Sequence, residues 1–289
     1  MRKKIAILLV LLISVQAIVR SKEIKILSWN IFMVPPIIFK ACQQERAYLI
    51  AAYIKNQNAD VVVLEETFMK STRKIIQDNV RDTFPYFSKI TKRGVLKNNS
   101  GVWIMSKFPI QNQHFLKYRN RKGSDIFSKK GAVFVEVEIE NKKIQLIATH
   151  TQSLKKFEKT RQKQFAQLKR ELADVVFTDS VPQLIIGDLN CDYYDTTAYE
   201  QMIKTFDVLP PTYFGETYSC DGLTNDLGYT FFDSTRETLD YILLRSEHQN
   251  IASVQPIEIL HPKMEKYFCK KPFLHLSDHN PIITNLELK

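Results

Sequence analysis

Apolar segments of strand length recur along the whole chain. The stretch EIKILSWNIF, from Glu23, alternates polar and apolar residues and then runs apolar, which is typical of a buried strand. The segment ADVVVLEETF, from Ala59, has the same character. We expect further strands in GVWIMSKFPI, GAVFVEVEIE, KIQLIATHT, PQLIIGDLN, TLDYILLR, ASVQPIEIL and DHNPIITNLEL. The second and third of these are predicted to pair through a turn at Glu140-Asn141.

Helical periodicity separates the predicted strands at irregular intervals. Pro35-Pro36 bar regular structure, and helices are predicted after them from about Cys42 to Lys55 and near Lys70 to Val80. A longer helix is indicated by four apolar residues on one face: Phe157, Phe165, Leu168 and Leu172. Because strands dominate and no internal repeat is present, the pattern favours an α/β fold with mixed sheets over a doubly wound parallel sheet.

The amino-terminal segment differs from the rest of the chain. Arg2, Lys3 and Lys4 precede the apolar run IAILLVLLISVQAIV, which contains the small-residue site Val15-Gln16-Ala17, and this is the pattern of a secretory signal peptide. The run is shorter than the roughly 20 residues that span a bilayer. We therefore expect residues 1–17 to be a cleaved signal peptide, residues 18–289 to form a single compact domain, and the protein to be secreted. An uncleaved membrane anchor is the alternative.

Composition narrows the choice of partners only slightly. Apolar residues make up 44% and charged residues 25% of the 289 residues, as in ordinary globular domains. The net charge is +10, and loss of three basic residues with the signal peptide leaves the chain basic. A basic surface favours polyanions or anionic membrane faces, but it is equally consistent with a well-solvated exterior.

The cysteines argue against a zinc site built from cysteine pairs. Cys42, Cys191, Cys220 and Cys269 are widely spaced and form no CxxC motif. In an oxidising compartment they allow one or two disulfides, whose connectivity the sequence leaves open. Asn98-Asn99-Ser100 is a glycosylation sequon, relevant only to a eukaryotic secretory pathway.

Polar side chains stand at the ends of several predicted strands. Each has an ordinary structural explanation, since Asn30 could cap a turn, Glu66 could start a helix and His150 could be a satisfied core histidine. Strand ends that carry polar groups nevertheless cluster where α/β proteins bind ligands. We therefore expect one pooled site containing Asn30, Glu66, His150, Asp188, Asn190 and Asp240, together with Asp278 and His279 of the motif LSDHNP.

The residue types in this set indicate metal-assisted hydrolysis of a phosphate ester. Carboxylates and amides suit a hard cation such as Mg²⁺, although other divalent cations are alternatives, and a histidine near neutral pKa can deprotonate water. The sequence has neither a GxSxG nucleophile motif nor a GxxxxGK[ST] phosphate loop. Water is therefore the expected nucleophile.

The ordered set SWN, LEETF, GVWIMSKFPI, THTQ, GDLN, LDYI and SDHNPI resembles the endonuclease/exonuclease/phosphatase superfamily over nearly the whole mature chain. The resemblance implies a DNase I-like fold, a four-layer α/β sandwich with two mixed β-sheets, forming a single catalytic domain.

Within the superfamily, three details resemble the secreted neutral sphingomyelinases, which split sphingomyelin into ceramide and phosphocholine. They are Lys130-Gly131 before a strand, Thr149-His150-Thr151-Gln152 followed by Arg161 and Gln164, and Phe68 after Glu66. The inositol-polyphosphate 5-phosphatases are also similar, but they usually have GDxNxR, and Asp192 stands where that arginine would fall. DNase I-type nucleases share the core, and a non-catalytic membrane- or nucleic-acid-binding module is the remaining alternative.

The resemblance also implies roles for individual residues. Glu66 would bind Mg²⁺ with Asn30 beside it, and His279 would be the general base that activates water, oriented by Asp278. Asp188 and Asn190 would hold the phosphate and the nucleophile or leaving group. The remaining implied roles are donation to the phosphoryl oxygens by His150, a supporting carboxylate at Asp240 and a phosphate-proximal cation at Lys130.

Two motifs depart from the family pattern, and a third segment suggests a membrane contact. A GDFN-like motif reads GDLN here, and a DHYP-like motif reads DHNP, so that Asn280 replaces an aromatic residue. The bacterial secreted enzymes have an aromatic hairpin before the final motif, and the matching segment is PKMEKYFCKKPFL. Aromatic side chains among lysines suit a lipid interface, although an ordinary packed loop is the alternative. The expected contact residues are Tyr267, Phe268, Phe273 and Leu274.

The expected partner is therefore a membrane lipid, sphingomyelin, with peripheral membrane contact. The sequence implies no obligate protein partner and makes nucleic acid an unfavoured alternative.

Overall fold

The computed structural model describes residues 22–91, 99–232, 234–266 and 273–289. The expected signal peptide, Asn98 of the sequon, and Tyr267, Phe268 and Cys269 of the expected hairpin lie outside the described residues. Within the described part of the chain, no helix combines the length and apolarity needed to cross a bilayer.

The first sheet has eight strands and contains both the earliest and the latest strands of the described chain. Its parallel pairs are β1 with β2 and β9 with β14, and its other pairs are antiparallel. The order along its main path is β3 (Tyr86–Phe87), β4 (Trp103–Ser106), β2 (Val61–Glu65), β1 (Lys22–Asn30), β15 (Ile282–Leu288), β14 (Ile257–Ile259) and β9 (Tyr213–Phe214), with β13 (Ala252–Val254) also paired to β15.

The second sheet has five strands, and only the pair β7 with β8 is parallel. Its order is β12 (Asp240–Leu244), β8 (Gln183–Asp188), β7 (Lys142–His150), β6 (Gly131–Ile139) and β5 (Ile110–Lys117). The expected turn between β6 and β7 is confirmed, because Glu140 and Asn141 both adopt positive φ, at 46° and 67°, as a tight hairpin turn requires. A separate two-stranded ribbon pairs β10 (Cys220–Asp221) with β11 (Arg236–Glu237).

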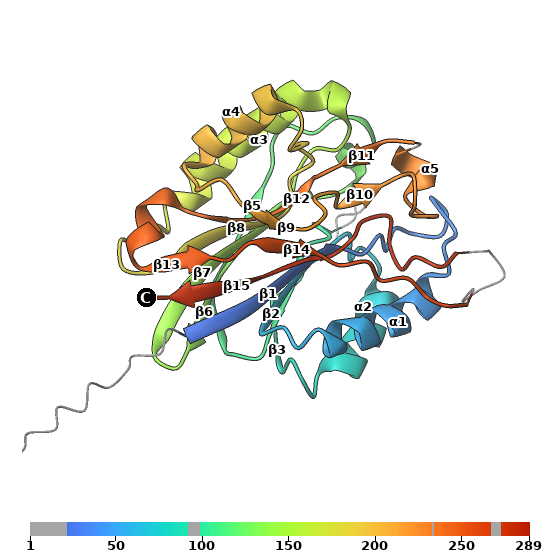
Figure 1. Ribbon diagram of the computed structural model, residues 1–289, viewed down its shortest axis with the longest axis horizontal. Coiled ribbons are helices and arrows are strands. Elements are labelled where there is room, and N and C mark those ends of the chain that lie inside the picture. The colour runs from blue at the N-terminus through green and yellow to red at the C-terminus, as the bar shows by residue number, and fades with distance from the viewer. Residues whose placement is uncertain (1–21, 92–98, 233, 267–272) are drawn as a thin grey trace, which may run out of the picture.

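Helices cover the outer face of each sheet (Figure 1). The helices α1 (Gln43–Asn56) and α2 (Lys70–Val80) pack on the first sheet, and α3 (Glu158–Leu168) and α4 (Thr196–Phe206) pack on the second. The shorter helical segments are η1 (Gly123–Phe127), η2 (Lys155–Phe157), the π-helical turn η3 (Lys169–Ala173), α5 (Tyr229–Phe232) and η4 (Ser246–Asn250).

The core has three apolar layers between these four structural layers. Aliphatic residues such as Val63, Leu146 and Ile186 fill the space between the sheets. Trp29 and Ile50 belong to the layer under α1 and α2, and Phe165 to the layer under α3 and α4. This arrangement is the predicted four-layer α/β sandwich with two mixed β-sheets.

Several elements differ from their sequence-based expectation. The long helix breaks into α3 and η3, and Phe157 lies outside the buried face shared by Phe165, Leu168 and Leu172, where it packs beside Gly123. The segment ASVQPIEIL forms two strands instead of one, because Gln255-Pro256 interrupts it between β13 and β14. The sequence interpretation missed α4 and β5.

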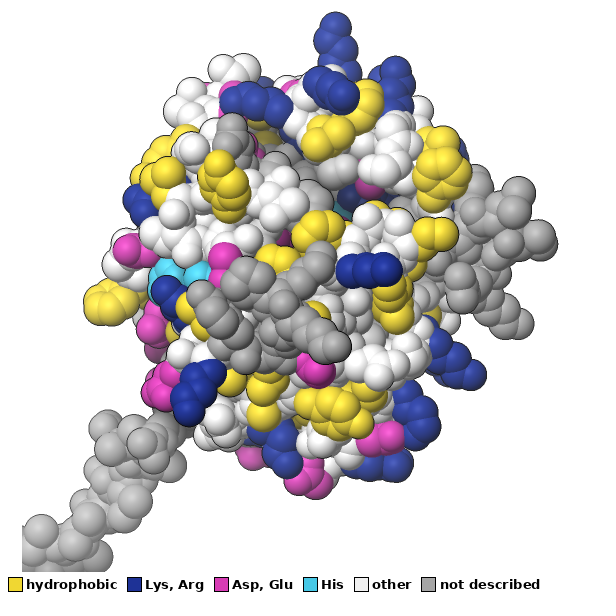
Figure 2. Space-filling model, turned by 90° about the vertical axis from the view of Figure 1, so that its right-hand side faces the viewer, with side chains coloured by type: hydrophobic (Ala, Val, Ile, Leu, Met, Phe, Trp, Pro, Cys, Tyr) yellow, Lys and Arg dark blue, Asp and Glu magenta, His cyan; other side chains and the backbone are white. Residues whose placement is uncertain are grey.

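Apolar side chains also remain on the surface around the loop that follows β1. Ile37 and Ile38 are 95% and 67% exposed. The face on the right of Figure 1 is turned toward the viewer in Figure 2, where hydrophobic side chains stand among Lys and Arg side chains. This is the face toward which the carboxyl end of β1 points.

Candidate active site

The strand register brings the predicted polar residues to one rim of the sandwich. In the first sheet Asn30, the last residue of β1, lies opposite Glu65, the last residue of β2. In the second sheet Asp188 lies between His150 on β7 and Asp240 on β12. Because the two sheets face each other, these two groups meet across the sandwich, as the sequence predicted for one pooled site.

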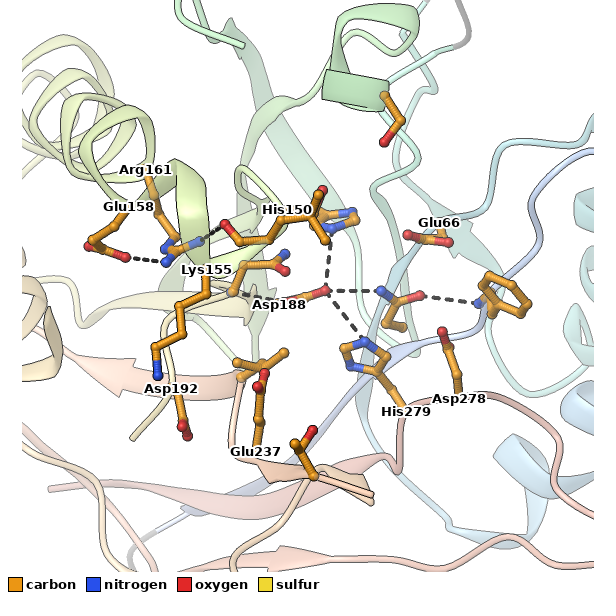
Figure 3. Close-up of a pocket in the computed structure, with 18 of the residues that line it drawn as sticks. Glu66, His150, Lys155, Glu158, Arg161, Asp188, Asp192, Glu237, Asp278 and His279 are labelled. Atoms are coloured by element: carbon orange, nitrogen blue, oxygen red, sulfur yellow. Dashed lines mark hydrogen bonds and ion pairs between the residues drawn. The ribbon is translucent and has the colours of Figure 1, made fainter. Parts of the chain in front are cut away.

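A cavity of about 440 Å³ opens at this rim. Glu66 and Asp278 line one end of it, and His150, Asp188 and His279 line its middle (Figure 3). Asn30 also belongs to the lining. The other end is lined by charged residues that the sequence had not placed in the site: Lys155, Glu158, Arg161, Asp192 and Glu237.

Asp188 is the hub of the hydrogen-bond network. Its Oδ2 accepts from Asn30 Nδ2 at 3.0 Å and lies 3.3 Å from His150 Nε2 and 3.8 Å from His279 Nε2. Its Oδ1 accepts from the backbone N–H of Asn190 at 2.9 Å. Asn190 adopts φ 49°, and its side chain lines the cavity. Asp188 therefore joins residues of both sheets through one buried carboxylate.

Asp240 holds the ring of His279. The distance from His279 Nδ1 to Asp240 Oδ2 is 2.9 Å, and both side chains are buried. Burial alone would lower the pKa of His279, but Cys220, Asp240 and Asp188 together raise it well above its usual value. The backbone of His279 is also fixed, because Trp29 Nε1 donates to the His279 carbonyl at 2.9 Å.

The expectation that Asp278 orients His279 is corrected by this geometry. Asp278 lies on the Glu66 side of the cavity, and Ser277 Oγ donates to its Oδ1 at 3.2 Å. Asp240, expected only as a supporting carboxylate, is instead the carboxylate on the imidazole. The position of Asp278 next to His279 in the sequence did not predict a contact between their side chains, because consecutive residues in an extended loop point in different directions.

His150 is held in one tautomer by Lys130. Lys130 Nζ lies 2.8 Å from His150 Nε2, donates to the Thr151 carbonyl at 2.8 Å and pairs with Asp125 at 3.1 Å. An ammonium group can only donate, so Nε2 accepts and the imidazole hydrogen is on Nδ1. Burial and the charge of Lys130 lower the pKa of His150 to about 3. His150 is therefore a neutral ring with an Nδ1–H donor, and that atom has no hydrogen-bond partner among the described residues.

Lys130 does not line the cavity itself, contrary to the expectation of a phosphate-proximal cation. It lies behind His150 and acts on the site through that ring.

The residues at the Glu66 end fit a hard cation. Glu66 is half-buried as a residue, but its Oε2 is buried and has no hydrogen-bond partner in the described structure. Burial and the nearby charge of Asp278 raise the pKa of Glu66 to about 8. Asn30 Oδ1 accepts from the Phe32 N–H at 3.1 Å and keeps a second lone pair. An oxygen-only set with uncompensated negative charge is what Mg²⁺ requires.

A buried arginine fixes the backbone near the Glu66 end of the cavity. Arg46 of α1 is fully buried and donates to the carbonyls of Ile31, Phe32 and Leu276 at 2.6, 3.1 and 2.8 Å. Desolvation lowers the pKa of Arg46 to about 10, while Asp278 and Glu66 act in the opposite direction. Arg46 thus fixes the loop after β1 to the loop that carries Asp278, and the sequence interpretation missed it.

Glu65 is a second buried glutamate beside the site. It is fully buried, Ser28 Oγ donates to its Oε1 at 3.2 Å, and its Oε2 has no partner among the residues described. Burial, together with Asp240 and Asp188, raises its pKa well above the usual value. Glu65 therefore lies within the sandwich, whereas Glu66 lines the cavity.

The expected hairpin contact can be followed only at Phe273 and Leu274. Phe273 packs against Phe39, with 6.3 Å between ring centroids, and belongs to a small cluster with Phe32 and Leu227. The Leu274 N–H donates to Asp226 at 2.6 Å. Both residues are half-buried, so this part of the segment is packed on the domain.

Among the cysteines, Cys42 is disulfide-bonded, and Cys191 and Cys220 are buried free thiols.

The fold and this network define a known class of proteins. The family model for the endonuclease/exonuclease/phosphatase family matches residues 27–279, and the chain belongs to that family.

Similar proteins within the family are sphingomyelinases. A sphingomyelinase C of Bacillus cereus is 30% identical over 278 residues, covering 86% of this chain and 82% of the relative. Sphingomyelinase C 2 of Leptospira interrogans is 32% identical over 259 residues, covering 79% of this chain but 40% of the relative. Against the two Leptospira relatives, the chain spans about half of their length or less.

Solved structures agree with this placement. The Staphylococcus aureus beta toxin matches with a TM-score of 0.83 and 26% identity, covering 90% of this chain and 99% of the toxin. A mutant of that toxin, solved with bound magnesium ions, has a TM-score of 0.84 at 24% identity and covers 91% of this chain and 99% of the toxin chain.

Proposed function

We propose that this protein is a secreted, magnesium-dependent phosphodiesterase that hydrolyses sphingomyelin to ceramide and phosphocholine. The observation that carries the proposal is the Asp188 network, in which a histidine–carboxylate pair stands beside an oxygen-only cation site. The similarity to sphingomyelinases C of three bacterial genera supports the choice of substrate.

His279 is the proposed general base. With Nδ1 on Asp240, its Nε2 faces the Asp188 side of the cavity and can take a proton from water as the water attacks phosphorus. The pairing with Asp240 stabilises the imidazolium that forms. In other histidine–carboxylate pairs, too, the histidine takes the proton and the carboxylate orients the ring.

His150 and Asn190 are the proposed donors to the phosphoryl oxygens. The Nδ1–H of His150 is buried and without a partner in the described part of the chain, so it can donate without first losing another hydrogen bond. Since burial and the charge of Lys130 lower the pKa of His150 and keep the ring neutral, this donor is available throughout the neutral pH range.

Glu66 and Asn30 would hold Mg²⁺. When bound, the cation offsets negative charge on the phosphoryl oxygens. The unpartnered Glu66 oxygen and the neighbouring Asp278 carboxylate are the features of this chain that support the assignment.

The far end of the cavity suits a cationic headgroup. Asp192 Oδ1 accepts backbone N–H groups of Tyr194 and Thr238 at 3.3 and 3.2 Å, which fixes its carboxylate at the cavity wall. Glu237 lines the same end, and burial and Asp192 raise its pKa. Two cations, Lys155 and Arg161, line this end as well, and Arg161 is already paired with Glu158. Carboxylates here favour a trimethylammonium group and disfavour the polyanionic headgroup of a phosphoinositide.

The test is release of phosphocholine from sphingomyelin vesicles, with magnesium or with EDTA. Parallel reactions contain a phosphoinositide and plasmid DNA. Magnesium-dependent release from sphingomyelin alone supports the proposal. Turnover of the phosphoinositide or DNA instead would retain the site but assign the chain to another branch of the family.

A further inference from the structure

Cys220 lies directly behind the proposed general base. A backbone bridge pairs Cys220 with His279, and the Asn280 N–H donates to the Ser219 carbonyl at 2.7 Å. On the other side, Ser219 Oγ accepts from the N–H groups of Leu239 and Asp240 at 3.0 and 3.3 Å. The strand that carries Cys220 is therefore fixed between the start of β12 and the loop that carries His279.

Three potential metal ligands converge at this point. Cys220 Sγ lies 3.3 Å from His279 Nδ1, and Asp240 Oδ2 lies 2.9 Å from the same nitrogen. One ligand atom from each residue lies within 4.8 Å of the other two, and all three residues are buried. Asp240 Oδ1 is also buried and makes no hydrogen bond to the described residues. The mechanism proposed above uses neither the thiol nor this second oxygen.

The spacing fits a tetrahedral zinc site. Zinc binds sulfur at about 2.3 Å and nitrogen or oxygen at about 2.0–2.2 Å, so tetrahedral ligand pairs are separated by about 3.5 Å for sulfur and nitrogen and about 3.3 Å for nitrogen and oxygen. The observed 3.3 and 2.9 Å are shorter by only a few tenths of an ångström. Small side-chain rotations would increase the separations of the three ligand atoms to those of a tetrahedral zinc site. Asp240 Oδ1 offers a further ligand atom.

We propose that Cys220, Asp240 and His279 form an inhibitory site for a thiophilic divalent ion such as Zn²⁺. The ligand chemistry separates it from the Glu66 end of the cavity. There the ligands are oxygens only, which suit Mg²⁺, whereas a thiolate and an imidazole favour zinc. The binding claim stands on the geometry alone, and the inhibition claim rests on the proposed function.

Inhibition follows from the position of the imidazole proton. In the proposed mechanism the active form of His279 has Nδ1–H facing Asp240, and Nε2 carries the lone pair that accepts a proton from water. Zinc binds the Nδ1 lone pair of the other tautomer, in which the ring hydrogen has moved from Nδ1 to Nε2. The Cys220 thiol loses its proton to solvent and binds as the thiolate. With Nε2 protonated, the neutral ring no longer accepts a proton, and hydrolysis stops.

The experiment compares two buried thiols in untagged protein. Cys220→Ser removes the sulfur beside His279, and Cys191→Ser is the matched control, since Cys191 lies in the apolar layer under α3 and α4. Zinc is titrated into the magnesium-activated reaction, and the rate of each variant is divided by its own rate without zinc. In parallel, Co²⁺ is added to metal-free protein, and the thiolate-to-cobalt absorption band is recorded.

We expect zinc to inhibit the parent protein and Cys191→Ser equally, and Cys220→Ser to need at least about tenfold more zinc. The cobalt band should appear in the first two proteins and be absent from Cys220→Ser and from Cys220→Ala. Equal zinc sensitivity of the Cys220 and Cys191 variants, or no cobalt band in the parent protein, would overturn the proposal. The cobalt measurement needs no substrate, so it still decides the site if sphingomyelin is not hydrolysed.

Discussion

At the scale of single residues, the site depends on carboxylates that differ in function because they differ in surroundings. Asp188 accepts hydrogen bonds from both sheets, Asp240 holds an imidazole, and Glu66 keeps a buried oxygen without a partner among the described residues. In the proposed mechanism the same chemical group thus serves as the centre of a hydrogen-bond network, as a positioning residue and as a cation ligand. Substituting each of these carboxylates in turn tests its role separately from the others.

The pair of His279 and Asp240 should behave as one unit. We expect His279→Ala to lower kcat for sphingomyelin by about 10²–10⁴-fold, the usual contribution of a positioned general base. Asp240→Asn should also lower kcat strongly, because an amide can favour the wrong tautomer of the ring. Initial rates at saturating magnesium measure both effects. His114→Ala on the exposed strand β5 is the control. Undiminished turnover by a folded His279→Ala protein would remove this residue as the base.

The adjacent residues Glu65 and Glu66 should respond differently to the same substitution. Glu66→Gln should abolish magnesium binding measured by calorimetry, because it removes the carboxylate with the unpartnered cavity oxygen. Glu65→Gln should leave magnesium binding in place, because Glu65 lies within the sandwich and does not line the cavity. Equal loss in both variants would contradict the assignment of Glu66 as the cation ligand.

Sequence patterns predicted which polar residues gather at the rim of the sandwich, but not the contacts among them. Each residue expected at a strand end reached the rim, because the end of a strand is readable from its apolar run. The partner of His279 was not readable, because Asp240 is 39 residues away in the chain and only the second sheet brings it near. Likewise, Glu65 and Glu66 follow one apolar run, and positive φ at Glu66 (56°), invisible in the sequence, separates their environments.

At the scale of elements, buried charge joins the ends of helices to the second sheet. Arg245 follows β12 and is buried, and its guanidinium pairs with Asp174 at 2.9 Å and Glu247 at 3.0 Å while lying over the Phe177 ring. The Arg245 N–H donates to the Gln183 carbonyl at 3.1 Å. Arg245 therefore connects the end of η3 and η4 through its side chain, and the start of β8 through its backbone.

This connection should make stability sensitive to acid. Burial alone would raise the pKa of Glu247, but the hydrogen bond from Arg245 lowers it to about 2. A lowered carboxyl pKa stabilises the fold above the unfolded value of about 4.5, and the contribution is lost as pH falls toward 2. Because Glu247 is 42% exposed, we expect at most about 1 kcal/mol. Urea unfolding at pH 6 and pH 3 should show a smaller pH effect in Glu247→Gln than in the parent; identical pH effects would contradict the prediction.

Elements were predictable where apolar runs were long. The strands β1, β2, β6, β7 and β8 and the helices α1 and α2 were all anticipated. The strand β5 was missed because it is an edge strand with mostly exposed polar residues and a bulge between Gln111 and His114. The helix α4 was missed although Asp195 caps it and Ala198, Met202 and Phe206 form a buried face at helical spacing. That signal was present in the sequence and was overlooked.

At the scale of the whole molecule, the cavity opens on a face with exposed apolar side chains. Ile38 and Leu154 both line the cavity and are 67% and 53% exposed, and Ile37 is 95% exposed. Sphingomyelin, the proposed substrate, has two long hydrocarbon chains and lies in a membrane, so these side chains are suited to contact that membrane. Phe273, by contrast, is packed against Phe39.

Replacing exposed isoleucines should therefore weaken membrane binding without unfolding the protein. We expect Ile37→Ser with Ile38→Ser to weaken binding to sphingomyelin vesicles by about tenfold or more, since burial of an isoleucine contributes about 1.5–3 kcal/mol. Co-sedimentation measures the binding. Val175→Ser, 71% exposed after the π-helical turn, is the matched control, and its binding should be unchanged. If both substitutions have the same effect, the apolar rim is not the contact surface.

The position of β15 has a consequence for the order in which activity arises during synthesis. The first sheet places β15 beside β1, with Lys22 opposite Leu288, so the earliest and latest strands of the described chain are neighbours. A ribosome delivers Asn30 and Glu66 long before His279, and β1 has only β2 at its flank until β15 emerges. The nascent chain consequently carries the cation-binding half of the proposed site without the proposed base. On this mechanism, a chain that stops before His279 is inactive.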